Sequence, residues 1–247
     1  GKADSELPVN PDVPLPPLEE LSLEEPEDLK PLYTLKTPEG EPVQLQESWG
    51  YVMQNRLEEY SSDIPLTDVC FFAGEINSYG ELSGSPNRSR ISTGNARCHL
   101  VIICESKSLT HFILNPQYNL RSKLIKDIVK SSASYDGVQI DFELIPARDR
   151  IHYLSFLADL RYSLGSKTWF TVCVTARTKY ISADDFPYAE ITKYCDRVFV
   201  MAYDESWSGS KPGPVASMNW CKRVADYAQK TIPEKKLIMG IPFYGRT

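Results

Sequence analysis

Seven short apolar segments recur along the chain from residue 49 onward. They are WGYVMQN (49–55), DVCFFAGEI (68–76), CHLVIICE (98–105), YDGVQIDFE (135–143), WFTVCVTA (169–176), RVFVMAYD (197–204) and KLIMGIPFYG (236–245). Most of them are nearly continuous in apolar residues, which is typical of parallel strands that are buried on both faces. The pattern therefore predicts seven buried parallel strands.

Amphipathic segments with helical periodicity separate the later strands. Residues 120–133 precede the fourth strand, residues 147–164 follow it, and residues 217–232 precede the seventh, with Ser217 as a candidate N-cap. Strands that alternate with helices indicate the α/β class, and a (β/α)8 TIM barrel fits best. The alternative is an open doubly wound sheet, but it would normally carry a glycine-rich phosphate loop after an early strand, and this sequence has none.

A barrel of this type needs eight strands, and the sequence shows seven with the eighth apparently missing. We expect truncation to account for this; the alternative is that YTLKTPEG (33–40) supplies the closing element. Residues 1–44 are rich in Pro and Glu and are expected to form a disordered linker or tether. Residues 45–247 are then a C-terminally incomplete barrel.

Composition narrows the classes of partner. Of the 247 residues, 42% are hydrophobic and 24% are charged, as in ordinary globular proteins. The net charge of -6 comes mainly from the first thirty residues, and we expect no nucleic-acid partner. There is no apolar run of about 18 residues, so we expect no transmembrane segment. The tether resembles one left after signal removal, which favours an exported or cell-envelope protein; a disordered tail on a cytoplasmic protein is the alternative. We expect the protein to be a monomer.

The cysteine pattern indicates free thiols rather than a metal site. No two of the six cysteines form a C-x-x-C pair, and none has metal-ligand spacing to a histidine; they are Cys70, Cys98, Cys104, Cys173, Cys195 and Cys221. Several fall inside the apolar runs, where cysteine acts as a small buried hydrophobe. We expect no zinc and no other cofactor.

The fourth strand carries the residues best suited to chemistry. Side chains alternate between the two faces of a strand, so Gln139, Asp141 and Glu143 share one face while the intervening apolar residues share the other. In a barrel the polar row lies inside, and Glu143 lies at the C-terminal rim, where such barrels build their active sites. Two neighbouring carboxylates raise the proton affinity of at least one, which suits a general acid.

A structural role is the alternative for these carboxylates. Asp141 and Glu143 could cap the following helix or form ion pairs with Arg148 or Arg150. An isolated pair of acids at this spacing would favour that reading.

The segment DGVQIDFE (136–143) resembles the DGxDxDxE motif of glycoside hydrolase family 18, the chitinase family. RVFVMAYDE (197–205) is similar to the sixth-strand signature of that family, GIPFYGRT (240–247) to its seventh strand, and WGY (49–51) to its first. The segments IDFE and MAYDESW are more similar in sequence to the bacterial spore cortex-lytic branch than to secreted chitinases. The resemblance thus implies peptidoglycan as substrate, with chitin or another glycan as alternatives.

The resemblance implies a retaining β-N-acetylglucosaminidase that uses substrate-assisted catalysis. Glu143 would protonate the glycosidic oxygen and later activate water, and Asp141 would orient the acetamide of the substrate. The carbonyl oxygen of that acetamide attacks the anomeric carbon, so no enzyme carboxylate becomes a nucleophile. Tyr203 would donate a hydrogen bond to the acetamide during this attack.

The same carry-over gives a wider set of substrate-binding residues: Tyr51, Asp136, Gln139, Met201, Asp204 and Tyr244. The chain departs from the family in two respects, because Gln139 replaces an Asp and the eighth-strand Trp of the sugar site is not in this sequence. We expect the Gln139 amide to donate a hydrogen bond to Asp141, which would keep Asp141 ionised and favour the protonated form of Glu143.

Two non-enzymatic interpretations stay open. A lectin-like relative would keep the barrel and bind carbohydrate without cleaving it, although such relatives commonly lack the glutamate that Glu143 supplies here. A purely structural barrel would leave its inward carboxylates as an unneeded cost.

Overall fold

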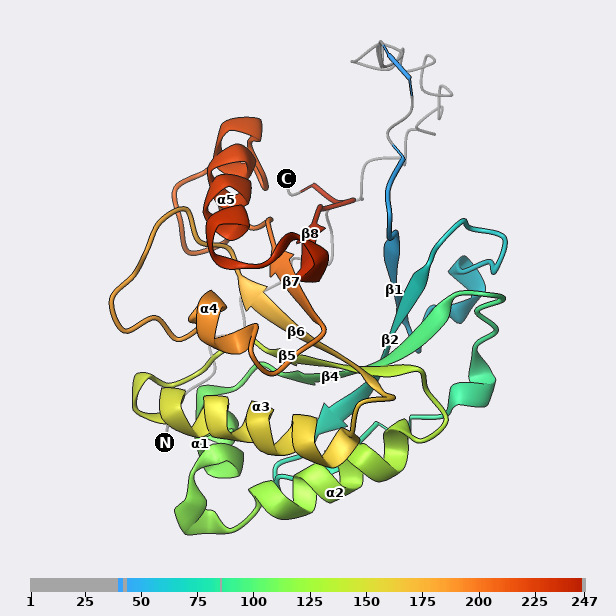
Figure 1. The fold of residues 1–247 in the computed structure, drawn as a ribbon, viewed down its shortest axis with the longest axis vertical. Coiled ribbons are helices and arrows are strands. Elements are labelled where there is room, and N and C mark those ends of the chain that lie inside the picture. The colour runs from blue at the N-terminus through green and yellow to red at the C-terminus, as the bar shows by residue number, and fades with distance from the viewer. Residues whose placement is uncertain (1–39, 42–43, 85, 246–247) are drawn as a thin grey trace, which may run out of the picture. The chain divides into compact units, whose positions relative to one another are not determined.

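The computed structural model describes residues 40–41, 44–84 and 86–245. The chain divides into two units, Gly1–Gln44 and Leu45–Thr247, and every helix and strand described below belongs to the second (Figure 1). Residues 1–39 and 42–43 of the expected linker lie outside the described residues, and so do residues 33–39 of the alternative closing segment.

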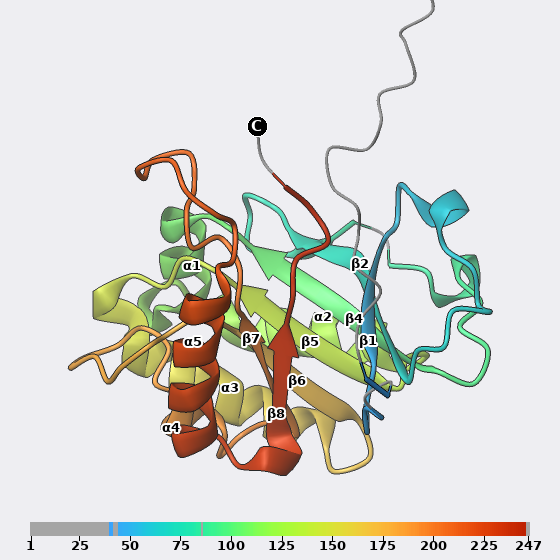
Figure 2. The same cartoon turned by 90° about the horizontal axis from the view of Figure 1, so that it is seen from above.

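Seven parallel strands form the sheet, as the sequence predicts. Their spatial order follows the chain: β1 (Trp49–Met53), β2 (Asp68–Ile76), β4 (Arg97–Cys104), β5 (Gly137–Phe142), β6 (Trp169–Thr175), β7 (Arg197–Met201) and β8 (Leu237–Gly240). Together they make an incomplete (β/α)8 barrel whose two edges, within the described residues, are β1 and β8 (Figure 2). A two-residue strand, β3 (Leu82–Ser83), pairs antiparallel with β2 and is too short to leave a sequence pattern.

The three predicted helices are present as α2 (Arg121–Ser132), α3 (Arg150–Leu164) and α5 (Met218–Thr231). Ser217 is the N-cap of α5, and its hydroxyl oxygen accepts from the Trp220 amide. Two short helices were not predicted, α1 (Lys107–Leu114) and α4 (Tyr188–Ile191), because about one or two turns give little periodicity. Single 3-10 turns cover Leu57–Glu59, Arg88–Arg90, Pro116–Tyr118, Ala147–Asp149 and Glu234–Lys236.

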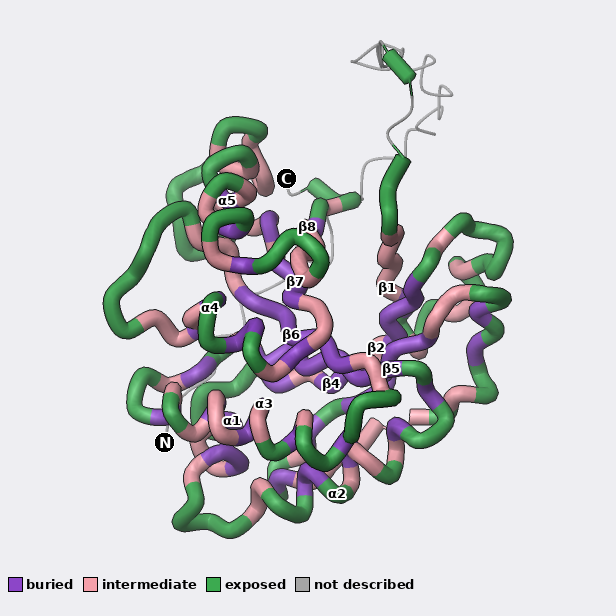
Figure 3. The backbone as a smooth tube through the Cα atoms, viewed as in Figure 1, coloured by how far each residue is buried: buried purple, intermediate pink, exposed green. Residues whose placement is uncertain are grey.

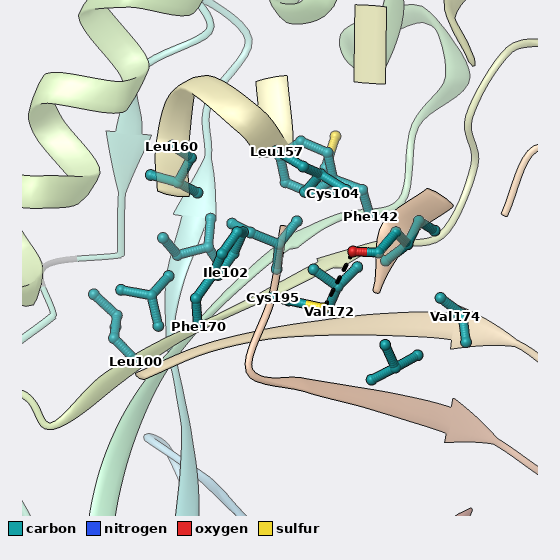
Figure 4. Packing of buried hydrophobic residues seen from close by; sticks show 14 of the residues in the cluster. Leu100, Ile102, Cys104, Phe142, Leu157, Leu160, Phe170, Val172, Val174 and Cys195 are labelled. Carbon is teal, nitrogen blue, oxygen red and sulfur yellow. Dashed lines mark hydrogen bonds between the residues drawn. The ribbon is translucent and has the colours of Figure 1, made fainter. Parts of the chain in front are cut away.

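The apolar core lies between the outer face of the sheet and the helices. Phe142 of β5 stacks on Phe156 of α3 with ring centroids 5.5 Å apart, and Phe170 of β6 packs in the same layer (Figure 4). The strands are largely buried, whereas the helices alternate between buried and exposed residues (Figure 3). The outward side chains of β5 thus anchor the strand, and its alternate side chains face the barrel interior.

Gly137 starts β5 where a side chain has no room. A Cβ atom at this position would meet the His99 ring and would lie 2.8 Å from the Cβ of Trp169. The glycine therefore allows β4 and β6 to close around the beginning of β5.

All six cysteines are free, and five of them are buried, which confirms the interpretation as core thiols. In the part of the chain that the structure describes, no helix is both long and apolar enough to cross a membrane.

Candidate active site at the carboxyl ends of the strands

Gln139, Asp141 and Glu143 form the polar row that the alternation predicts. Gln139 is fully buried and pairs in register with Val101 of β4, and Asp141 pairs with Ile103 and is 4% exposed. Glu143 follows the last residue of β5 and is only partly buried; its amide donates to the Cys104 carbonyl at 3.1 Å. The row therefore runs from the closed interior to the open rim.

Both carboxyl groups have raised pKa values. Burial, followed by the charge of Glu143, raises the pKa of Asp141 to about 7. Burial also raises the pKa of Glu143, with the charges of Glu105 and Asp204 adding to it. The raised pKa values agree with the sequence interpretation, but loss of solvent contributes more than mutual repulsion.

The predicted hydrogen bond from Gln139 to Asp141 is wrong. The Tyr51 hydroxyl donates to Gln139 Oε1 at 2.6 Å, and Gln139 Nε2 has no hydrogen-bond partner among the described residues. Asp141 Oδ1 is buried and also lacks a partner. Without a donor on that oxygen, Asp141 is not held ionised as we expected, because burial favours its neutral form.

Residues at and just after the end of β7 lie near the same carboxylates. Met201 is the last residue of the strand, and Tyr203 follows it with a pKa raised by burial and by the charges of Cys173, Asp141 and Glu143. Asp204 has a φ of 59°, in the left-handed region, and accepts a hydrogen bond from the Tyr244 hydroxyl at 2.7 Å. The Tyr203 and Tyr244 rings meet edge to face.

Asp136 is not brought to this site. It precedes β5, at the opposite end from Glu143, and its carboxylate accepts from the Cys98 amide at 2.7 Å. Its backbone also bonds to Cys98 and Trp169, so the residue joins the starts of neighbouring strands. We predicted Asp136 at the site because it belongs to the same sequence motif as Glu143. The length of β5 separates the two residues.

The alternative that Asp141 or Glu143 forms an ion pair with Arg148 or Arg150 is wrong. Arg148 Nε lies 3.8 Å from Asp149, and Arg150 Nε donates to Asp185 at 2.8 Å. Neither arginine forms an ion pair with Asp141 or Glu143.

Two site residues escaped the sequence reasoning. Cys173 of β6 is a hydrogen-bond partner of Asp141, and its sulfur lies 3.7 Å from the Tyr51 hydroxyl oxygen. Glu105 follows β4, and its charge raises the pKa of Glu143. Its position directly after a strand was the available signal, because parallel strands end at one rim. Cys173 lies within an apolar run, so its position in the sequence did not mark it as a site residue.

Among the described residues, no three His, Cys, Asp or Glu side chains gather as metal ligands. The arrangement instead offers a partly buried carboxyl with a raised pKa at the rim, a buried carboxyl behind it and a tyrosine hydroxyl from the segment after β7. Such a set can transfer protons and orient a polar substituent.

The comparisons with known proteins identify the family. Residues 107–247 match the glycosyl hydrolases family 18, and the chain belongs to that family. An uncharacterized glycosylase, YvbX of Bacillus subtilis, is 42% identical over 117 residues, which cover 45% of this chain and 34% of the relative. The cortical fragment-lytic enzyme of Bacillus anthracis is 27% identical over 197 residues, covering 73% of this chain and 45% of the relative.

The fold is also similar to that of a solved spore cortex-lytic enzyme. The crystal structure of the Bacillus cereus spore cortex-lytic enzyme SleL matches with a TM-score of 0.69 at 24% identity, covering 79% of this chain and 50% of that one. At this identity the likeness shows the barrel fold. The chain spans between about a third and just under half of the length of these curated relatives.

Proposed function

We propose that this chain carries the catalytic groups of a retaining β-N-acetylglucosaminidase that acts by substrate-assisted catalysis. The observation that supports it is the row on β5, in which partly exposed Glu143 with a raised pKa stands at the rim beside buried Asp141. A carboxyl that stays protonated toward neutral pH is what a general acid requires.

Three side chains divide the proposed reaction, with Glu143 acting first as acid and then as base. Glu143 gives its proton to the glycosidic oxygen as the bond to the anomeric carbon breaks. The acetamide carbonyl oxygen forms the new bond to that carbon, while Asp141 holds the acetamide N–H and Tyr203 donates to the acetamide. Water, deprotonated by Glu143, then opens the oxazolinium intermediate and regenerates both the acetamide and the acid.

The relatives favour peptidoglycan as the polymer. Two of the matches are named for lysis of spore cortex or its fragments, and the third is a glycosylase. We therefore propose an exported or envelope-associated protein that acts as a monomer on a glycan containing N-acetylglucosamine, with chitin as the second candidate. Tyr51, Gln139, Met201, Asp204 and Tyr244 would support or line the sugar site.

The test is an assay of the full-length gene product on purified peptidoglycan and on chitin oligomers, with products identified by mass spectrometry. We expect N-acetylglucosaminidase products from peptidoglycan. Tight binding of either glycan with no cleavage would replace the proposal with the lectin-like alternative.

A further inference from the structure

Cys173 lies on the inward face of β6, beside the carboxylate row of β5. Gln139 of β5 pairs in register with Thr171 of β6. Two residues further along these parallel strands, Asp141 and Cys173 occupy the next inward positions. Cys173 is 2% exposed, yet it is not a member of the apolar cluster between the sheet and the helices. Its burial is therefore inside the barrel, next to the polar row.

Two polar side chains contact the Cys173 thiol. Its sulfur lies 3.7 Å from the Tyr51 hydroxyl oxygen, and it forms a hydrogen bond with the Asp141 carboxyl group. The same Tyr51 hydroxyl donates to Gln139 Oε1 at 2.6 Å. Gln139 and Asp141 are thus linked across the barrel, through a side chain of β1 and a side chain of β6.

The direction of these hydrogen bonds follows from the protons that are present. The Tyr51 hydroxyl has one proton and gives it to Gln139, so its oxygen can only accept from the thiol. Burial and the charge of Asp141 raise the pKa of Cys173, so the thiol keeps its own proton. That proton has two acceptors within reach, the Tyr51 oxygen and the Asp141 carboxylate. The ionised acceptor forms the stronger hydrogen bond.

One oxygen of Asp141 is left without a protein partner. Asp141 Oδ1 is buried and has no hydrogen-bond partner among the described residues. In this part of the chain, Cys173 is the one side chain that forms a hydrogen bond with Asp141. The carboxyl group therefore has a thiol to hold it and an unused buried acceptor, which a substrate N–H can satisfy.

We propose that Cys173 is a positioning residue, whose thiol proton holds the ionised Asp141 carboxylate while Asp141 Oδ1 stays free for the acetamide N–H of the substrate. The acetamide part of this inference rests on the proposed function, whereas the thiol contact can be tested on the protein alone. Burial and the charge of Glu143 raise the pKa of Asp141, and the thiol bond opposes them. Loss of the thiol should therefore raise that pKa further.

Other titratable groups surround Asp141. Glu143 and Glu105 raise its pKa through their charges, from the end of β5 and from the segment after β4. The remaining groups are thiols and phenols whose own pKa values are raised by burial, so they stay neutral near pH 7: Tyr51 of β1, Cys70 of β2, Tyr153 of α3, Cys173 of β6 and Tyr203 after β7. None of these groups carries a positive charge, so the thiol bond is the contribution that favours the ionised form.

The test follows the ionisation of Asp141 directly. The full-length protein is labelled with carbon-13 at its aspartate carboxyl carbons and titrated by NMR, and Asp141→Asn identifies the resonance by its loss. Cys173→Ala should move the Asp141 titration to higher pH, and Cys173→Val should do the same without leaving a space in the interior. Cys173→Ser keeps a donor at this position, so its titration should stay close to that of the parent.

Cys195→Ala is the matched control, because it removes a buried thiol from the apolar cluster (Figure 4). The Cys195 thiol donates to the Ile191 carbonyl at 3.4 Å, so its loss should leave the Asp141 titration unchanged. On peptidoglycan, Cys173→Ala should lower kcat/KM about tenfold, as the loss of one hydrogen bond to a charged group predicts. Cys173→Ser should recover most of that loss.

Three results would overturn the inference. They are an Asp141 titration that does not move to higher pH in Cys173→Ala and Cys173→Val, a shift of the same size in Cys173→Ser, and an unchanged kcat/KM in Cys173→Ala. The titration decides the thiol contact whether or not the protein cleaves a glycan. Failure of the inference is therefore distinct from failure of the proposed hydrolase.

Discussion

Buried aspartates at the two ends of the barrel have pKa values that are shifted in opposite directions. Asp68 at the start of β2 is completely buried, yet its pKa is lowered to about 2. Asp141 near the end of β5 is 4% exposed, and its pKa is raised to about 7. Burial alone raises the pKa in both cases, so hydrogen-bond partners decide the difference.

Several charged side chains at the amino ends of the strands form one paired network. Arg97 makes two 2.7 Å bonds to Asp68, and His99 Nε2 lies 2.6 Å from the same carboxylate. Glu47, before β1, accepts two bonds from Arg197 of β7 and one from Arg97. Both arginines lie over the Trp169 ring. These contacts join β1, β2, β4 and β7, so this end stabilises the fold.

The carboxylate row at the end of β5 lacks such compensation. Asp141 Oδ1 and Gln139 Nε2 are buried without partners, and Glu143 meets the negative charges of Glu105 and Asp204. Unpaired buried polar groups cost folding free energy and are typical of functional sites. The comparison separates an end whose paired charges hold the barrel together from an end with buried, unpaired carboxyl and amide groups, where we propose that proton transfer takes place.

The largest effect on activity is expected at the carboxyl end. Glu143→Gln should lower turnover by about two orders of magnitude or more while sugar binding survives, because only proton transfer is removed. Steady-state kinetics and a binding titration would check this. Glu190→Gln, in an exposed pair with Lys193, is the control. Comparable rates for Glu143→Gln and the parent would exclude Glu143 as the acid.

The largest effect on stability is expected at the amino end. Asp68→Asn should lower the free energy of unfolding by about 3 kcal/mol, because Arg97 and His99 lose a buried partner. Denaturant unfolding would measure it. Asp127→Asn, which removes an exposed pair with Lys123, should cost less than about 1 kcal/mol. Because the folded pKa of Asp68 is lowered, its contribution is present above about pH 4 and is lost as the pH falls toward 2.

Asp141→Asn should change the free energy of unfolding in the opposite direction from Asp68→Asn. The folded pKa of Asp141 is raised, so its neutral form favours folding below about pH 4, and that contribution is lost as the pH rises through 7. The variant should therefore be more stable than the parent at pH 8 and nearly equal to it at pH 4. Its hydrolysis should nevertheless be severely reduced. A stability difference that does not depend on pH would contradict this assignment.

A smaller effect is expected from Gln139→Asp. The new carboxylate could still accept from Tyr51, but it would titrate together with Asp141 as a coupled pair. The pH dependence of kcat/KM should then gain or shift one limb, because that profile reports groups of the free enzyme. Gln229→Asp, on the exposed surface of α5, is the matched control. Superimposable profiles would leave Gln139 as an inert filler of the interior.

The sequence predicted the fold well where hydrophobic pattern decides the structure. The seven strands and three long helices follow from apolar periodicity, and the alternation on β5 correctly directed Gln139 and Asp141 inward. It was wrong where partners across the barrel decide. Tyr51 is 88 residues away from Gln139 in the sequence, and its hydroxyl donates to Gln139 Oε1. No local sequence pattern predicts such a contact.

The amino-end network was also beyond the sequence reasoning. Glu47 and Arg197 are 150 residues apart, and each looks like an ordinary surface charge in its local context. Asp136 shows the converse error, because a motif groups residues that a strand then places at opposite ends. Pattern gives the faces of each element, whereas the pairing of charges depends on the closed arrangement of strands.

The stereochemistry of the first product tests the central claim most directly. If the acetamide attacks one face of the anomeric carbon and water then enters from the face of the leaving group, the configuration is retained. Proton NMR during early hydrolysis of a β-linked substrate by the full-length protein should show the β-anomer first, followed by slow mutarotation. An initial α-anomer would contradict substrate-assisted catalysis by Asp141 and Glu143.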